Sequence, residues 1–231
     1  MRLNLPEITL SSVCWGGNSF LYDLVWAYTQ FNRKTRFAEK IFFIGDEIDY
    51  AAYGNFFVSE GIQVISLKRG YDKRQYSHLM IKELNNFIST DFVMTFQFDG
   101  FIANINAWDE SFLKYDYIGA PWWFEDGNNV GNGGFSIRSK RLLEVLAKDD
   151  HIQRSDPEDH AICRVYGDYL CEEHGIVFAP EKIAARFAVE GPPWDPGKYV
   201  GQFGFHSWRQ LRAYLDRRKR EAYMNSFIPA L

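Results

Sequence analysis

Asp99 stands between an apolar run and Gly100, an arrangement that suits contact with phosphate groups. Residues 91–96 (Asp-Phe-Val-Met-Thr-Phe) have the composition of a buried strand, so Asp99 is expected at the carboxyl end of a strand. A carboxylate beside a residue without a Cβ can approach a metal ion and its diphosphate closely. The same dipeptide is typical of a plain turn between two apolar runs, and the residues alone leave both interpretations open.

Three glycines and an asparagine open the segment Gly131-Asn-Gly-Gly-Phe-Ser-Ile-Arg138. Such residues let the backbone amides of Gly133 and Gly134, and the side-chain amide of Asn132, face a ligand without steric hindrance. Neither a G-x-G-x-x-G pattern nor a P-loop accompanies them, which argues against a dinucleotide fingerprint. A β-bulge or a hairpin before a short strand would use the same residue types.

Two adjacent acids, Glu158 and Asp159, follow Pro157 at the start of a segment with helical spacing. Acids in a first helical turn complement the helix dipole and cap free amides. A carboxylate close to a hydroxyl group also serves as a general base, because it can accept the proton while the oxygen attacks carbon. The pair therefore predicts either a helix cap or a catalytic base.

None of the five histidines forms an H-x-x-x-H or H-E-x-x-H pattern, so a histidine-built zinc site is not indicated. His206 lies between a glycine-rich loop and the last helix, where it is a candidate metal or phosphate ligand or a structural residue. The three cysteines are scattered and lack a C-x-x-C pairing, which is typical of a reducing compartment. No G-x-S-x-G elbow supports a hydrolase.

The elements that must position these residues alternate between strand and helix in the first half of the chain. Continuous apolar runs predict strands and amphipathic stretches predict helices. The strands are expected at residues 8–14, 40–45, 62–67 and 91–96, and the helices at 19–31, 51–60 and 74–88. This alternation predicts right-handed crossovers and a parallel α/β sheet. Glycine, proline and tryptophan crowd the second half, which predicts loops there.

The composition is that of a folded globular protein, with 46% apolar and 24% charged residues in 231. A net charge of -4 gives no general attraction for nucleic acid, so no nucleic-acid partner is expected. The chain has no run of 18 apolar residues, and its first residues do not form a signal peptide. We expect a cytoplasmic protein. Aromatic residues reach 17%, enough to fill a core and to line a carbohydrate or nucleobase site.

Together the motifs resemble a glycosyltransferase-like domain family that has been catalogued as a domain of unknown function. The matching segments occur in the order of the family and cover about residues 8–206. They are Phe96-Gln-Phe-Asp-Gly-Phe101, Trp108-Asp109 with Phe112-Leu113, Tyr115-Asp-Tyr-Ile-Gly-Ala-Pro-Trp122, Gly131-Asn-Gly-Gly-Phe-Ser-Ile-Arg138, Pro157-Glu-Asp159 with Cys163-Arg164, Ala184-Ala-Arg-Phe-Ala-Val-Glu190 and Phe203-Gly-Phe-His206.

The resemblance implies a GT-A type fold: a Rossmann-like, mostly parallel sheet with helices on both faces and a loop-rich half for the acceptor. It also implies transfer of a sugar from a nucleotide-sugar donor, in first place a UDP-sugar, to a hydroxyl group of a glycan or lipid-linked acceptor, with inversion. Asp99 would occupy the place of the last acid of an Asp-x-Asp motif, and Gln97 stands where the first acid is usual. Because an amide is a poorer cation ligand than a carboxylate, dependence on manganese or magnesium stays open. Phe98 and Ser207 depart from the common family pattern.

The roles implied for the site follow from this resemblance. Asp159, with Glu158 second, would act as the base. The donor diphosphate would lie against Asp99, Gln97, Gly100, Asn132, Gly133, Gly134 and His206, with Asp99 and His206 as ligands of a divalent cation. Trp122, Trp123 and Trp194 would stack on sugar rings or simply pack.

Two other classes of protein remain as alternatives. A non-catalytic carbohydrate-binding module would keep the aromatic loops without turning over a donor. A nucleotidyltransferase would share the α/β platform, although residues 11–17 lack the basic side chains that such enzymes use to clamp phosphates.

We expect a single domain over residues 1–206 and a basic amphipathic helix and tail over residues 207–231. Trp208, Leu211, Tyr214 and Leu215 fall on one side of a helix predicted at 208–222, and basic residues crowd the remainder. The helix would either dock on the domain with a solvated basic face or bind anionic lipid at the inner face of the membrane.

Overall fold

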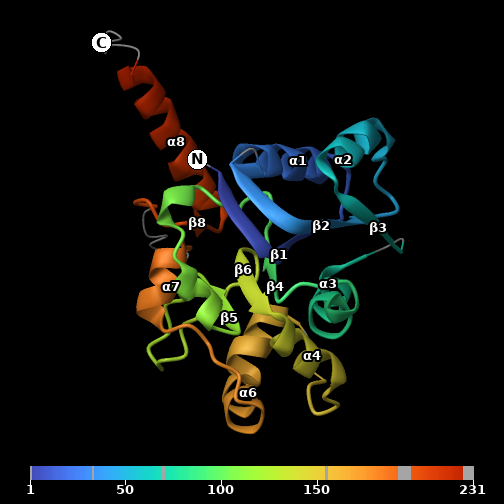
Figure 1. Ribbon diagram of the computed structural model, residues 1–231, viewed down its shortest axis with the longest axis vertical. Coiled ribbons are helices and arrows are strands. Elements are labelled where there is room, and N and C mark those ends of the chain that lie inside the picture. The colour runs from blue at the N-terminus through green and yellow to red at the C-terminus, as the bar shows by residue number, and fades with distance from the viewer. Residues whose placement is uncertain (1, 33, 69–70, 154–155, 192–198, 226–231) are drawn as a thin grey trace.

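The computed structural model describes residues 2–32, 34–68, 71–153, 156–191 and 199–225. Its strands are β1 (Leu3–Cys14), β2 (Thr35–Gly45), β3 (Gln63–Leu67), β4 (Phe92–Thr95), β5 (Tyr117–Gly119), β6 (Ser136–Ser139), β7 (Ala188–Val189) and β8 (Gly204–Phe205). Its α-helices are α1 (Asn18–Asn32), α2 (Gly54–Glu60), α3 (Lys73–His78), α4 (Lys140–Lys148), α5 (Glu158–His160), α6 (Gly167–His174), α7 (Glu181–Phe187) and α8 (Trp208–Asn225). Figure 1 shows their arrangement.

A six-stranded sheet in the order β3-β2-β1-β4-β6-β5 forms the centre of the molecule. Strands β3, β2, β1 and β4 run parallel to one another, as the alternation of strands and helices predicts. The expected mostly parallel α/β sheet is therefore confirmed. A separate pair of short parallel strands, β7 and β8, lies beside this sheet.

Strand β6 runs antiparallel to both of its neighbours, β4 and β5. Its first residue, Ser136, pairs with Thr95, the last residue of β4. The residues just before β6 therefore meet the residues just after β4. In this way one reversed strand brings the glycine-rich segment beside Asp99.

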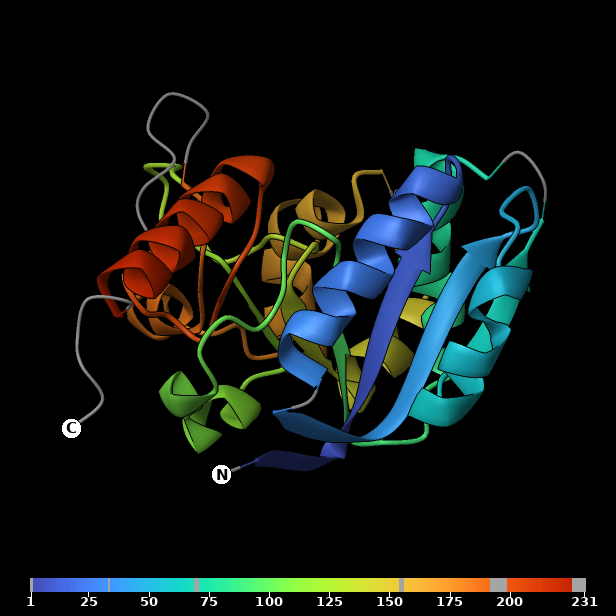
Figure 2. The same cartoon turned by 90° about the horizontal axis from the view of Figure 1, so that it is seen from above.

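Helices cover both faces of the sheet. Neighbouring residues of each central strand point to opposite faces, so each of these strands packs against helices on both sides. Phe42 and Ile44 of β2 pack in the core cluster that contains α1. Ile41 and Phe43 of the same strand pack in the cluster that contains α3 and the turns after it. Figure 2 shows α1 and α2 lying across strands β1 to β3. This arrangement explains why the strand sequences are apolar on both faces.

The long helix predicted at residues 74–88 is wrong in its continuity. Helix α3 ends at His78 and is followed by a π-helical turn, Leu79–Glu83, and a 3-10 turn, Leu84–Asn86. The apolar spacing continues through these turns, so the sequence period does not separate them from an α-helix. Strands β1 and β2 also begin five residues earlier than predicted, at Leu3 and Thr35.

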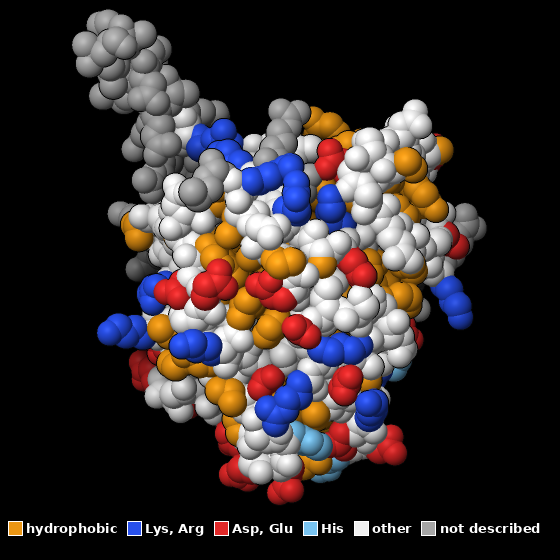
Figure 3. Space-filling model, in the orientation of Figure 1, with side chains coloured by type: hydrophobic (Ala, Val, Ile, Leu, Met, Phe, Trp, Pro, Cys, Tyr) orange, Lys and Arg blue, Asp and Glu red, His pale blue; other side chains and the backbone are white. Residues whose placement is uncertain are grey.

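Helix α8 docks on the domain through Leu211 and Tyr214, which are both buried. Trp208 was expected on the same apolar side but is 57% exposed. Its ring instead makes an edge contact with Phe98 at 5.3 Å between centroids. In Figure 3, Lys and Arg side chains gather next to this helix. Within the described part of the chain, no helix combines the length and the apolar composition needed to cross a membrane.

Candidate active site

Four segments that are distant in the sequence meet at the carboxyl end of β4. His206 lies at their centre: its Nε2 atom is 3.7 Å from Asp99 Oδ1 and 3.3 Å from Gln97 Oε1. Its Nδ1 atom lies 2.9 Å from Nδ2 of Asn132 and 3.3 Å from Oε1 of Glu190. The residues that the sequence predicts for diphosphate binding are thus neighbours in space. Glu190 joins them, and the sequence assigned it no role beyond membership of a motif.

Asp99 is a buried carboxyl group that lacks a full set of partners. Only 9% of the residue is exposed, and its Oδ1 atom makes no hydrogen bond to the described part of the chain. Burial raises the pKa of this carboxyl group, and the charge of His206 works in the opposite direction. A buried acceptor without a partner costs free energy, and such atoms concentrate at functional sites. Asp99 is therefore a candidate ligand-binding residue.

The protonation of His206 depends on the acids around it. Burial lowers its pKa, but the hydrogen bond to Glu190 and the charges of Asp99 and Glu190 outweigh this effect and raise the pKa above the ordinary 6.5. A protonated ring donates from Nδ1 to Glu190, whereas a neutral ring accepts there from Asn132. The raised pKa favours the first arrangement.

The glycine-rich loop approaches two side chains so closely that only glycine fits. A Cβ atom on Gly134 would lie 2.0 Å from His206 Nε2, and one on Gly133 would lie 2.0 Å from Glu158 Oε1. Asn132 adopts a positive φ of 57° and accepts hydrogen bonds at Oδ1 from the amides of Gly134 and Phe135. The loop thus folds on itself and seats His206, and these amides are already engaged.

Glu158 and Asp159 have different environments despite their adjacent positions. Glu158 is buried, and its Oε1 atom forms an ion pair of 3.2 Å with the fully buried Arg138 of β6. Burial and then the charge of Asp159 raise the pKa of Glu158, while Arg138 opposes the shift. This pair anchors α5 to the sheet. Sequence reasoning had no means of finding it, because nothing in the sequence pairs an arginine of one element with an acid of another.

Asp159 is partly exposed and caps the glycine-rich loop. Its Oδ2 atom accepts a hydrogen bond of 2.9 Å from the amide of Gly133, and Oδ1 accepts one of 2.8 Å from the amide of His160. The carboxylate keeps further lone pairs for a second partner. Of the two predicted acids, Asp159 is the one that is partly exposed to solvent.

An apolar cavity of about 340 Å³ lies next to this cluster, between the end of β1, the start of α1 and the residues after β4. Its lining includes Trp15, Phe20, Gln97 and Phe98. Trp15 also stacks on Tyr76 with ring centroids 5.1 Å apart. The cavity is large enough for a flat ring, and Gln97 joins it to the polar cluster. Trp15 and Phe20 were not predicted, since aromatic residues at these positions are typical of core packing.

Two of the three tryptophans predicted to stack on sugars, Trp122 and Trp123, pack around Phe124. Trp122 packs against Gly131 and meets Phe124 edge to face, with centroids 5.9 Å apart. Trp123 stacks on the same Phe124, with ring centroids 6.0 Å apart. The guanidinium of Arg164 also lies over the Phe124 ring, 3.8 Å from its centroid. Neither tryptophan lines the apolar cavity. Trp194 lies outside the described residues.

A divalent cation fits this site only if the protein supplies some of its ligands and a bound nucleotide supplies the others. Among the described residues, no group of three His, Cys, Asp or Glu side chains has the spacing of a closed metal site. Asp99 Oδ1 has no hydrogen-bond partner among the described residues and faces His206 Nε2 at 3.7 Å, so these two atoms would hold a cation when the His206 ring is neutral. Magnesium and manganese sites on nucleotides commonly use one or two protein ligands and complete the shell with phosphate oxygens and water.

Solved structures with a similar architecture include the glycosyltransferase GlyE of Streptococcus pneumoniae TIGR4, with a TM-score of 0.50 and 11% identity over 92% of this chain and 60% of that chain. A protein named as a glucose-1-phosphate thymidylyltransferase, from Bacillus anthracis, has a TM-score of 0.43 and 11% identity over 74% of this chain and 86% of that chain. The likeness to GlyE shows the fold alone, a mostly parallel sheet of the GT-A type. The GT-A fold expected from the sequence is therefore confirmed.

The chain belongs to the family of proteins of unknown function DUF5672, whose model matches residues 61–206. The resemblance to a family catalogued by unknown function is thereby confirmed. No curated protein matches the chain. The chain spans 60% of the length of GlyE, so the activity of a whole protein of that size is not transferred to it.

Proposed function

We propose that this protein transfers a sugar from a nucleotide-sugar donor to a hydroxyl group of a glycan or a lipid-linked glycan. The observation that carries the proposal is the buried Oδ1 atom of Asp99, which has no hydrogen-bond partner among the described residues and faces His206 at 3.7 Å. Asp99 follows closely on Gln97 and Phe98, which line the apolar cavity. In open α/β sheets, ligands bind beyond the carboxyl ends of the strands. The GT-A type fold supports the same reaction class.

The donor would place its base in the apolar cavity and its diphosphate against the polar cluster. Trp15 offers an aromatic face for a base, and Gln97 lines the cavity while contacting His206. The imidazolium of His206, held by Glu190, would offset negative charge on the phosphates. Alternatively, a cation held by Asp99 and a neutral His206 would supply this charge neutralisation for the leaving diphosphate, because a protonated ring has no lone pair for a metal. A uridine nucleotide is our first expectation for the donor.

The acceptor hydroxyl group would lose its proton to Asp159. As the bond between the sugar carbon and the phosphate oxygen breaks, the acceptor oxygen forms a new bond on the opposite face of the same carbon. The configuration at that carbon is inverted, and the electron pair of the broken bond leaves with the diphosphate. The amide of Gly133 holds one oxygen of Asp159 and thereby orients the carboxylate. Glu158 takes no part in this step, because Arg138 holds its carboxylate.

The first experiment is a donor screen on the full chain. Thermal shift and calorimetry with UDP-, GDP- and dTDP-sugars, with and without manganese, would identify the nucleotide, and donor hydrolysis would report turnover. Asp99→Asn should weaken donor binding or metal-dependent turnover and leave the melting temperature unchanged. Asp150→Asn is the matched control, because Asp150 is an exposed acid remote in sequence from the cluster.

Three results would contradict the proposal. Full activity of Asp99→Asn would remove Asp99 from the site. Saccharide binding without any turnover of a nucleotide sugar would identify a non-catalytic carbohydrate-binding module. Release of pyrophosphate from a nucleoside triphosphate and a sugar phosphate would identify a nucleotidyltransferase.

A further inference from the structure

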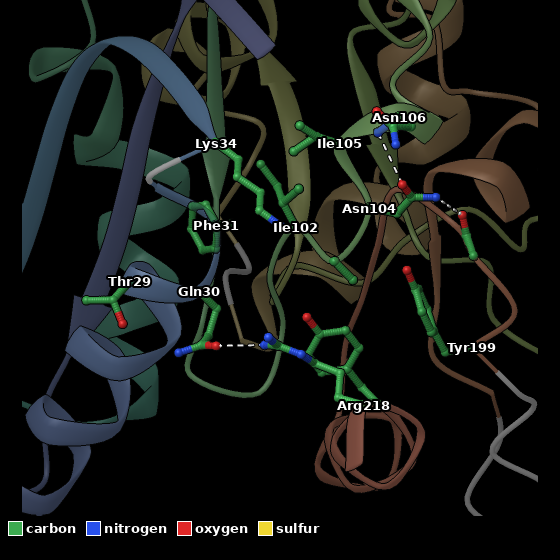
Figure 4. Close-up of a pocket in the computed structure, with 13 residues that line it drawn as sticks. Thr29, Gln30, Phe31, Lys34, Ile102, Asn104, Ile105, Asn106, Tyr199 and Arg218 are labelled. Carbon is green, nitrogen blue, oxygen red and sulfur yellow. Dashed lines mark hydrogen bonds between the residues drawn. The ribbon is translucent and has the colours of Figure 1, made fainter. Parts of the chain in front are cut away.

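A second and larger cavity, of about 950 Å³, lies between the end of α1, residues 102–106 and helix α8 (Figure 4). Its volume is at the upper end of the range for small-molecule sites, which is about 300–1,000 Å³. Neither Asp99 nor His206 lines it. The cavity is therefore separate from the candidate active site.

The charged side chains of this cavity are all positive. Lys34 and Arg218 line it, and no lining residue is an acid. Figure 4 shows the two side chains entering from different elements, Lys34 after α1 and Arg218 from α8. Arg218 donates to the neutral amide oxygen of Gln30 at 3.0 Å. Among the described residues, neither cation has a carboxylate partner, although the whole protein carries a net charge of -4.

The remaining lining combines amides, hydroxyl groups and aromatic rings. Gln30, Asn104 and Asn106 supply amides, and Tyr199 and Tyr214 supply rings with hydroxyl groups. The Asn104 side chain is fixed, since its Nδ2 atom donates to the carbonyl oxygen of Gly201 at 2.8 Å. Amides and hydroxyl groups match the many hydroxyl groups of a sugar, and the half-buried ring of Tyr199 offers an apolar face for its C–H groups. The ring of Tyr214 is buried against Phe101 and Phe205 and supports this wall.

We propose that this cavity binds an anionic saccharide, an oligosaccharide that carries carboxylate or phosphate groups. Lys34 and Arg218 would neutralise the acidic groups, and Arg218 would do so with its planar fork of donors. The volume indicates a chain of several sugar units rather than a single ring. This second site does not depend on the proposed sugar transfer, because it shares none of the residues assigned to the donor or to the base.

The two sites are nevertheless joined by short stretches of backbone. The amides of Ala103 and Asn104 both donate to the carbonyl oxygen of Phe203. Asp99 stands a few residues before the first of these segments, and His206 stands shortly after Phe203. The wall of the cavity is thus continuous with the two backbone segments that position Asp99 and His206.

The test is calorimetry on the full chain with three probes: a trimer of galacturonic acid, the neutral trimer maltotriose, and glucose 6-phosphate. We expect the acidic trimer to bind and maltotriose to bind at least tenfold more weakly. Binding should weaken between about 0.1 M and about 1 M salt, where the Debye length falls from ~10 Å to ~3 Å. Tighter binding of glucose 6-phosphate than of the trimer would support the site and identify a free sugar phosphate as its occupant.

Variants locate the binding and keep it distinct from the donor site. The pair Lys34→Gln and Arg218→Gln should weaken the acidic trimer at least tenfold and leave the melting temperature unchanged. Arg212→Gln is the matched control, because Arg212 is exposed on the same helix and does not line the cavity. Asp99→Asn should leave trimer binding unchanged. Equal binding of both trimers, binding unaffected by the double variant, or no binding of either anionic probe would overturn the proposal.

Discussion

The buried pair of Arg138 and Glu158 permits a quantitative test of how the site is held together. Arg138 is fully buried, and beyond its 3.2 Å contact with Glu158 its Nε atom donates to Ser136 Oγ at 3.3 Å. Its Nη1 atom finds no hydrogen-bond partner among the described residues. Replacing Arg138 with Met keeps much of the volume but leaves Glu158 buried without its counter-ion.

Removing one partner of a buried ion pair costs about 3–5 kcal/mol of unfolding free energy. In a chain of this length, 1 kcal/mol corresponds to ~2–4 °C, so Arg138→Met should lower the melting temperature by about 6–20 °C. Replacing both partners, as Arg138→Met with Glu158→Leu, removes the unpaired charge and should recover most of the loss. Scanning calorimetry of the two single variants and the double variant gives the coupling between them.

Lys148→Met is the matched control. Lys148 forms a surface ion pair of 3.6 Å with Glu144, and its side chain is 73% exposed. Exposed pairs contribute at most about 1 kcal/mol, so this variant should melt close to the wild type. A loss of less than about 1 kcal/mol for Arg138→Met, or a double variant as unstable as the sum of the single ones, would refute the reasoning.

Three further predictions concern the base, a half-buried acid and the last helix. Asp159→Asn can still accept the amide hydrogen bond, so donor affinity should hold while transfer falls by about a hundredfold or more; a lower melting temperature with normal transfer would identify a cap. The hydrogen bond from Tyr169, followed by that from the amide of His151, lowers the pKa of Asp149 to about 2. A depressed carboxyl pKa stabilises the fold above the ordinary value of 3.8 and loses this effect as the pH falls to about 2, so the difference in melting temperature between wild type and Asp149→Asn should shrink over that interval. For α8, we expect co-sedimentation with anionic liposomes that weakens with salt and with replacement of residues 217–220 by Gln or Ser. Each basic residue should contribute about 1 kcal/mol to this binding. No lipid binding at low salt would show that the helix only docks on the domain.

The central strands were predictable because their apolar runs are long and continuous. The direction of β6 could not be predicted, since a four-residue strand gives no indication of which strands it pairs with. The break in the helix after His78 was hidden because a π-helical turn preserves the apolar face that the period detects. The burial of Trp208 was predicted wrongly because helical spacing assigns a residue to the apolar side of a helix but does not show whether the domain covers that side along its whole length.

The candidate site was predictable at residues whose type and local motif indicate ligand contact. Asp99, Asn132 and His206 stand in motifs that suggest contact with a ligand, and the structure brings them together. Glu190 and Arg138 act through partners that lie 16 and 20 residues away, respectively, and pairings of this kind depend on the tertiary fold. Sequence patterns report local periodicity, so such pairs are visible only after the strands are ordered.

The place of His206 in the chain has a consequence for the time at which the site forms during synthesis. His206 contacts Gln97 across 109 positions of sequence, and it directly follows β8, the last strand in the described part of the chain. Chains are synthesised from the amino-terminal end at about 5–20 residues per second, and a domain generally folds as a unit. Asp99 and Asn132 are therefore made several seconds before the imidazole that contacts their side chains in the folded protein. We expect the nascent chain to gain competence for ligand binding only after residues 203–206 have been made.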